Sequence, residues 1–129
     1  MIKNISIDTN IYTAFKMSDP EVIDTLSSYD HIGLDITVIA ELLSGFKGGK
    51  KDQKNRDELK QFINNPRVVI LNHDLETAEY YSVIYLNLKS RGKPIPTNDI
   101  WIAANALRHN YALCTKDKHF QFIESLILI

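Results

Sequence analysis

The chain has 129 residues, of which 44% are hydrophobic and 24% are charged, and its formal net charge is -1. This length suits one domain with a buried core and is too short for two ordinary domains, so we expect a single domain over residues 1–129. The near-neutral charge excludes a globally basic nucleic-acid-binding surface, and the single cysteine, Cys114, excludes an internal disulfide framework.

No part of the sequence has the composition of a membrane segment. The first ten residues contain charged and polar side chains where a secretory signal needs an apolar core, and no run approaches the ~18 apolar residues of a transmembrane helix. We therefore expect a cytoplasmic protein with no membrane partner.

The chain begins with alternating strand and helix patterns. Residues 2–7 place isoleucine at alternate positions and lead to Asp8, which predicts a strand that turns into a short helix. Asp19 and Pro20 have the order of a helix cap and a first helical residue. The helix that they start gives way to a second predicted strand over residues 31–34.

A second apolar helix pattern covers residues 37–46, with Thr37 as its predicted cap. Glu41 lies about one turn from the start of this helix, on a stripe of polar or small side chains. A glycine-containing turn and a polar helix follow, and Pro66 ends that helix.

Residues 67–71 are rich in β-branched side chains and predict a buried parallel strand. Asp74 then begins the longest helix, for which Gly92 is the predicted C-terminal cap. A last strand is predicted over residues 111–115, and the apolar tail over residues 126–129 is either an edge strand or part of a final helix.

The segment before the last strand has a proline-containing loop and then a helix. Pro94 and Pro96 each exclude helical backbone for the residue before them, so a loop leads to Thr97. Thr97 or Asn98 then caps a largely buried helix, which places Asp99 in its first turn. An acid there has an ordinary explanation, since the helix dipole stabilises it by roughly 0.3 to 1 kcal/mol.

The alternation of strands and helices predicts the α/β class, as a three-layer α/β/α sandwich with a mainly parallel central sheet. Asp8 and Asp117 follow strands, whereas Glu41 and Asp99 lie near helix starts, and all of these ends meet at one rim of such a sheet. Converging carboxylates persist only if some are protonated or a cation neutralises them. Ligands that are all oxygen favour Mg²⁺ or Mn²⁺ over zinc.

Four pieces of sequence around these acids resemble the motifs of the PIN-domain nucleases, namely SIDTN at 6–10, ITVIAEL at 36–42, IPTNDIWIAA at 95–104 and CTKDKHF at 114–120. The match spans nearly the whole chain and is most similar to the VapC-like toxins of bacterial and archaeal toxin–antitoxin pairs. The resemblance implies a PIN-like fold and a metal-dependent endoribonuclease that inhibits translation by cleaving RNA, with an antitoxin protein as partner. It also implies cleavage that leaves a 5′-phosphate and a 3′-hydroxyl.

Phosphodiester hydrolysis by water suits the four acids. Water must lose a proton, and the charges on the phosphate and on the leaving oxygen must be neutralised. We expect Asp8, Asp99 and Asp117 to hold the metal ion. Glu41 completes its shell, bridges to it through water, or orients the attacking water as a base.

Polar neighbours of the acids have supporting roles. Thr9, Asn10 and Thr115 are predicted donors that fix the carboxylates. No pair of histidines has the spacing of metal ligands on a helix, so surface or capping roles are expected for them, with His119 near Asp117 a minor candidate for an RNA contact.

Two further features bear on partners. Lys50, Lys51 and Lys54 belong to a basic run that is either a solvated face or a contact for RNA phosphates. Tyrosines on more than one side of the long helix, at 80, 81 and 85, exceed what core packing needs and indicate a homodimer seam or an antitoxin groove.

Other functions also gather acids at strand ends. A phosphoacceptor receiver domain needs two acids after the first strand and a lysine-proline pair near the last one, whereas this chain has one acid there and Asp117 after the lysine. A stand-alone RNA-processing PIN nuclease and a catalytically silent PIN binding module are the remaining alternatives. The intact acids argue against the silent module, and a nuclease assay with and without Mg²⁺ separates an active nuclease from that module.

Overall fold

The structure, a computed structural model, describes residues 1–129. Its strands are β1 (Asn4–Ile7), β2 (His31–Asp35), β3 (Val68–Leu71) and β4 (Ala112–Cys114). Its helices are α1 (Thr9–Lys16), α2 (Pro20–Ser27), α3 (Ile36–Lys47), α4 (Asp52–Ile63), α5 (Leu75–Ser90) and α6 (Thr97–His109), followed by a 3₁₀ helix, η1 (Lys118–Phe122). None of the helices combines the length and apolar character needed to cross a bilayer.

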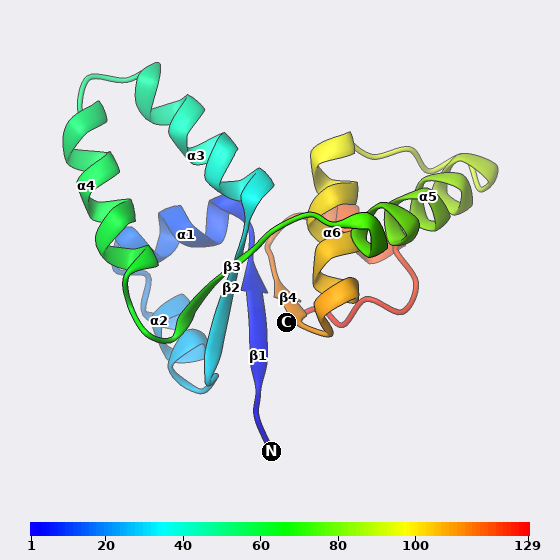
Figure 1. Cartoon of the computed structure of the whole chain (residues 1–129), viewed down its shortest axis with the longest axis horizontal. Helices are drawn as coiled ribbons and strands as arrows, with labels where there is room; N and C mark the ends of the chain where they lie inside the picture. The colour runs from blue at the N-terminus through cyan, green and yellow to red at the C-terminus, as the bar shows by residue number, and fades with distance from the viewer.

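The four strands form one parallel sheet in the order β3-β2-β1-β4. Ile7 is in register with Leu34 on one side and with Cys114 on the other, so the carboxyl ends of three strands lie level. Figure 1 shows α1 to α4 on one side of the sheet and α5, α6 and the C-terminal segment on the other. The predicted three-layer α/β/α sandwich is therefore confirmed.

Local cap chemistry sets several helix ends as predicted. The side chain of Asp19 accepts hydrogen bonds from the backbone N–H groups of the first turn of α2, and Asp74 forms a reciprocal capping box with Thr77 at the start of α5. Gly92 adopts φ +67° after α5, and its N–H donates to the carbonyl of Lys89. A glycine reaches this left-handed conformation without steric cost, so the helix stops there.

Two predicted caps are wrong. The cap of α3 is Asp35 and not Thr37, because the Asp35 carboxylate accepts the Thr37 N–H at 2.6 Å and starts the helix two residues earlier. The cap of α6 is Pro96 and not Thr97 or Asn98. The Pro96 carbonyl accepts the first bonds of α6, and no side-chain cap is present.

One edge strand of the sheet, β3, is less buried than predicted, and the other edge shows where the apolar tail lies. β3 was expected to be buried, but it pairs only with β2, and Ile70 is 38% exposed. On the opposite edge, Leu113 of β4 forms a parallel bridge with Leu128. The apolar tail is therefore an edge pairing beside β4 and not part of a helix.

A buried polar cluster connects the layers near the rim. The Asp35 carboxylate, at the end of β2, is fully buried and accepts a hydrogen bond from Asn105 of α6 at 2.8 Å. Asn105 also donates to the carbonyl of Leu71 in β3 at 2.8 Å and accepts from the Thr77 hydroxyl of α5 at 3.2 Å. One amide thus joins the ends of two strands to two helices.

We predict that Asn105→Leu lowers the free energy of unfolding by about 3 kcal/mol, because it leaves a buried carboxylate and a buried carbonyl without their donor. Chemical denaturation followed by circular dichroism measures the change. Asn72→Leu is the matched control, since Asn72 is exposed and its side chain makes no hydrogen bond; a loss of stability equal to that of the control would contradict the role of Asn105.

Candidate active site

The structure brings the four predicted acids to one rim of the sheet. Asp8 directly follows β1, and Asp117 lies three residues after the end of β4; each caps the helix after it. Glu41 is in the second turn of α3, and Asp99 is in the first turn of α6. The charges of Asp117 and Glu41 act on both other acids and raise the pKa of each.

Asp8 is the most enclosed of the four acids. Burial raises the pKa of its carboxyl group, and the hydrogen bonds donated by the Thr115 hydroxyl and by the backbone N–H of Ile11 oppose that effect. The Thr115 hydroxyl oxygen in turn accepts the backbone N–H of Asp117 at 2.9 Å. Thr115 therefore links the two acids that follow neighbouring strands, as a carboxylate-fixing residue should.

Two side chains hold Glu41. The Thr9 hydroxyl donates to Glu41 Oε1 at 2.6 Å, and the Asn98 amide donates to Oε2 at 3.3 Å. Asn98 entered the sequence-based prediction only as a possible helix cap. Asn10, the third predicted donor, is exposed and makes no side-chain hydrogen bond to any of the acids. It follows Thr9 by one residue in α1 and so lies on a different side of that helix.

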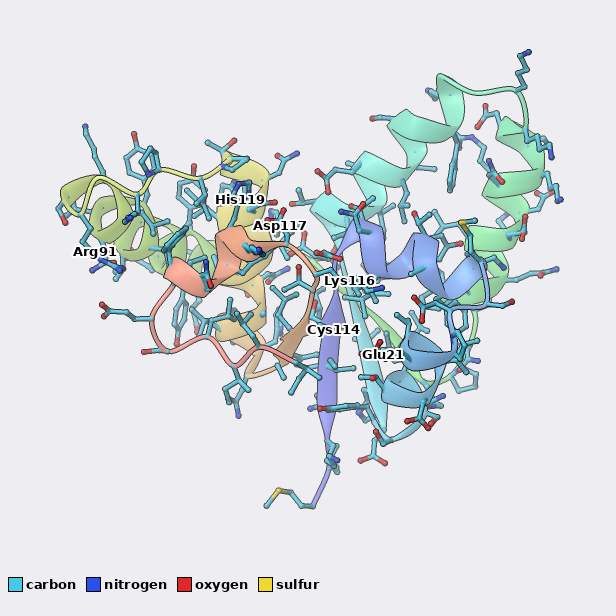
Figure 2. All side chains as sticks on the ribbon, turned by 180° about the vertical axis from the view of Figure 1, so that it is seen from behind. Glu21, Arg91, Cys114, Lys116, Asp117 and His119 are labelled. Carbon is cyan, nitrogen blue, oxygen red and sulfur yellow. The ribbon has the colours of Figure 1, made fainter.

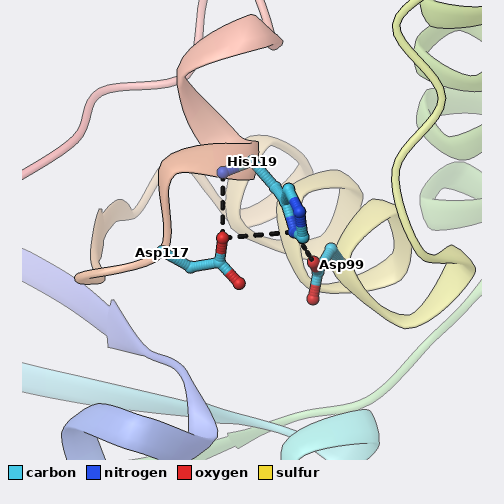
Figure 3. A group of neighbouring side chains, drawn as sticks. All are labelled: Asp99, Asp117 and His119. Atoms are coloured by element: carbon cyan, nitrogen blue, oxygen red, sulfur yellow. Dashed lines mark hydrogen bonds and ion pairs between the residues drawn. The ribbon is translucent and has the colours of Figure 1, made fainter.

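His119 is closer to the acids than the sequence indicated. Its Nδ1 lies 3.1 Å from Asp99 Oδ2 and 3.2 Å from Asp117 Oδ1, and its backbone N–H donates to the same Asp117 oxygen (Figure 3). Figure 2 shows Asp117 and His119 together beyond the end of β4. The backbone bond to Asp117 is the expected local role, whereas the contact with Asp99 spans 20 residues and depends on the fold.

The structure brings two carboxylates and one imidazole together as a group that could hold a metal ion, and Asp8 and Glu41 lie outside this group. Asp99, Asp117 and His119 each offer an atom, and these atoms lie within 4.8 Å of one another. Burial raises the pKa of the Asp99 carboxyl, and the charges of Asp117 and Glu41 raise it further, against the lowering effect of His119. A cation would relieve this repulsion, and carboxylate oxygens are the ligands that Mg²⁺ and Mn²⁺ prefer.

The predicted basic contacts lie away from the acids. Lys50 and Lys51 are in the turn between α3 and α4, and Lys54 is in the first turn of α4. This turn is at the end of α3 that points away from the sheet (Figure 1). All three lysines are exposed and form no ion pair, so their contact with RNA stays a prediction that requires RNA to run along α3.

Comparison with known proteins agrees with this geometry. The family model described as "PIN domain" matches residues 5–124. The chain belongs to the PIN domain family. The sheet and the acidic rim described above are thus those of a PIN domain.

Individual relatives align with this PIN domain over nearly its full length. Ribonuclease VapC2 of Rickettsia felis is 32% identical over 127 residues, which cover 95% of this chain and 93% of the relative. The structure of VapBC-1 from nontypeable Haemophilus influenzae has a TM-score of 0.88 and 28% sequence identity. The alignment covers 98% of this chain and 96% of that chain. The structure of VapBC2 from Rickettsia felis, bound to a fragment of promoter DNA, has a TM-score of 0.86 and 27% sequence identity. The alignment covers 98% of this chain and 97% of that chain.

We predict that Asp99→Asn stabilises the metal-free PIN domain at neutral pH. The folded-state pKa of Asp99 is raised above its ordinary value of 3.8, so the stability that its protonated form contributes is complete below that pH and is lost as the pH rises through the folded pKa. In EDTA, the unfolding free energies of the parent and the variant should therefore diverge above pH 3.8, with the variant the more stable. Urea denaturation over a pH series measures both curves, and curves that stay parallel would contradict a raised pKa for Asp99.

Proposed function

We propose that this chain is a metal-dependent endoribonuclease that hydrolyses phosphodiester bonds of RNA, and that it is the toxin of a toxin–antitoxin pair. The observation that carries the proposal is the convergence of Asp8, Glu41, Asp99 and Asp117 at one rim of a PIN domain. Relatives named Ribonuclease VapC, aligned over more than 90% of their length, support RNA as the substrate. Residues 1–129 then form one nuclease domain, with its RNA substrate in the cytoplasm.

The chain's own residues account for the positioning that hydrolysis needs. Asp8, Asp99 and Asp117 would hold Mg²⁺, or Mn²⁺ in its place, and the ion supplies positive charge to the phosphate and acidifies water. Thr115 keeps Asp8 and the Asp117 backbone in fixed relation. Glu41, which two donors hold in place, is oriented to accept a proton from the attacking water.

The partners follow from the same comparisons and from the surface of α5. The similar structures include VapBC proteins, and one from Mycobacterium tuberculosis is described as a member of the VapBC family of toxin–antitoxin systems, which supports a cognate antitoxin. On α5, Val83 is 68% exposed and Leu86 is 65% exposed. Burial of these side chains against a second copy would remove apolar surface from water, which supports a homodimer through this helix.

We predict that Asp99→Asn lowers the rate of RNA cleavage by roughly 100-fold or more, because it removes a charge that holds the cation which stabilises the reacting phosphate. Incubation of purified protein with total RNA, followed by mapping of the new 5′ ends, measures the rate. Asp24→Asn is the matched control, since Asp24 is an exposed acid on α2 away from the rim. Full activity in the Asp99 variant would refute the assignment of the acids.

We predict that EDTA abolishes cleavage and that Mg²⁺ or Mn²⁺ restores it, whereas Ca²⁺ does not. The larger and more flexible coordination sphere of Ca²⁺ does not fix the attacking and leaving oxygens in line. Calorimetric titration with Mn²⁺ tests the site independently of activity: the parent should bind the ion more tightly than Asp99→Asn. Cleavage that resists EDTA would exclude the metal-dependent reaction.

A further inference from the structure

A groove opens directly beside the acidic rim. It has a volume of about 570 Å³ and lies between the first turns of α3 and the start of α6. Glu41 and Asn98, which are hydrogen-bonded to each other, line the groove and also border the acids. The exposed side chains of Ala40 and Ser44 form its wall on α3. Any molecule that reaches the acids can therefore also enter this groove.

The opposite wall of the groove is aromatic and fixed in place. The His73 ring stacks on Trp101 with 4.7 Å between centroids and 13° between planes, and the Tyr81 ring lies 4.3 Å from Trp101 at a tilt of 33°. His73 Nε2 lies 3.1 Å from the buried Asp35 carboxylate. His73 and Trp101 both line the groove, and the His73 side chain is 23% exposed, so this wall offers aromatic surface to another flat ring.

We propose that this groove holds one nucleobase of the RNA substrate, next to the phosphodiester at the acids. The inference rests on the proposed nuclease function and extends it to recognition of the substrate. A phosphate does not suit the groove, because Glu41 repels anions and no lysine or arginine is among the lining residues. A neutral base does suit it, since stacking on an aromatic side chain is the usual way in which proteins hold unpaired bases.

The polar atoms in the groove can hydrogen-bond the edge of a stacked base. Ser44 Oγ donates its proton to the Ala40 carbonyl at 2.8 Å, which leaves the hydroxyl oxygen to accept. The Asn98 amide nitrogen donates one hydrogen to Glu41, which leaves its second hydrogen to donate and Asn98 Oδ1 to accept. The groove therefore offers both donor and acceptor atoms, and every base, uracil included, can pair with them through its polar edge.

Trp101 is the single tryptophan of the chain, so its emission reports on the groove without labelling. The experiment titrates the uncleaving Asp99→Asn protein, with Mg²⁺ present, with single-stranded oligoadenylate, oligocytidylate, oligouridylate and an abasic ribose-phosphate oligomer of equal length. We expect all three base-containing oligomers to change the emission and to bind roughly tenfold more tightly than the abasic oligomer, the scale of one base stack. The abasic oligomer should leave the emission unchanged.

Ser44→Tyr fills the groove from an exposed helical position and does not disturb the buried cluster. In the same background it should weaken binding of oligoadenylate roughly tenfold, the scale of one lost base stack. Ser27→Tyr is the matched control, because Ser27 is also an exposed helical serine whose hydroxyl donates to a backbone carbonyl. It should behave as the parent does.

Equal emission changes with abasic and base-containing oligomers would overturn the proposal, as would unchanged binding in Ser44→Tyr. If Ser44→Tyr keeps its oligonucleotide affinity but loses the antitoxin, the groove is a peptide site and the RNA assignment is wrong. The nuclease function is tested separately with the parent chain. Parent protein that fails to cleave RNA with Mg²⁺ refutes that function, whereas parent cleavage that Ser44→Tyr leaves unaltered in rate refutes only the groove.

Discussion

The hydrogen bond between the buried Asp35 carboxylate and the Asn105 amide sets the geometry of the rim. Asp35 also caps α3, and Asn105 lies within α6, so one contact joins the start of the helix that carries Glu41 to the middle of the helix that carries Asp99. Desolvation of a carboxylate costs several kcal/mol unless donors surround it, and here a backbone N–H, an amide and the His73 ring supply them. Because losing any of these donors is expensive, the contact holds the two helices in one relative position.

The strand order brings the other two acids close together. β1 and β4 are neighbours, so the residues that follow them, Asp8 and Asp117, must come close together at the rim. The folded chain thus holds four carboxylates where their charges oppose one another, and it offsets part of that repulsion with hydrogen bonds from Thr115 and His119. Carboxylates that repel one another lower the stability of the folded chain. Such a destabilising arrangement is expected at a functional site and is unusual elsewhere in a protein.

The features that were predictable from sequence are those with local causes. Asp19, Asp74 and Gly92 act through backbone groups within a few residues, and the acids were located by their positions at the ends of elements. The local pattern predicts Thr37 as the cap of α3, because it does not contain the contact between Asp35 and its partner 70 residues away. The contact between His119 and Asp99 and the edge position of β3 depend likewise on how elements are arranged, which a local pattern does not contain.

The two helices at the rim present different residues to the acids and to the groove. On α3, Glu41 lies at the boundary while Ala40 and Ser44, one before it and three after, face the groove. On α6, Asp99 belongs to the acidic cluster whereas the next groove residue along, Trp101, lies two positions later. Neighbouring residues on a helix point about 100° apart, so a groove-facing side chain can change while the acids stay where the buried Asp35 contact holds them. On the proposed function, substitutions at the exposed positions of α3 would therefore change how the groove holds RNA without altering the acids.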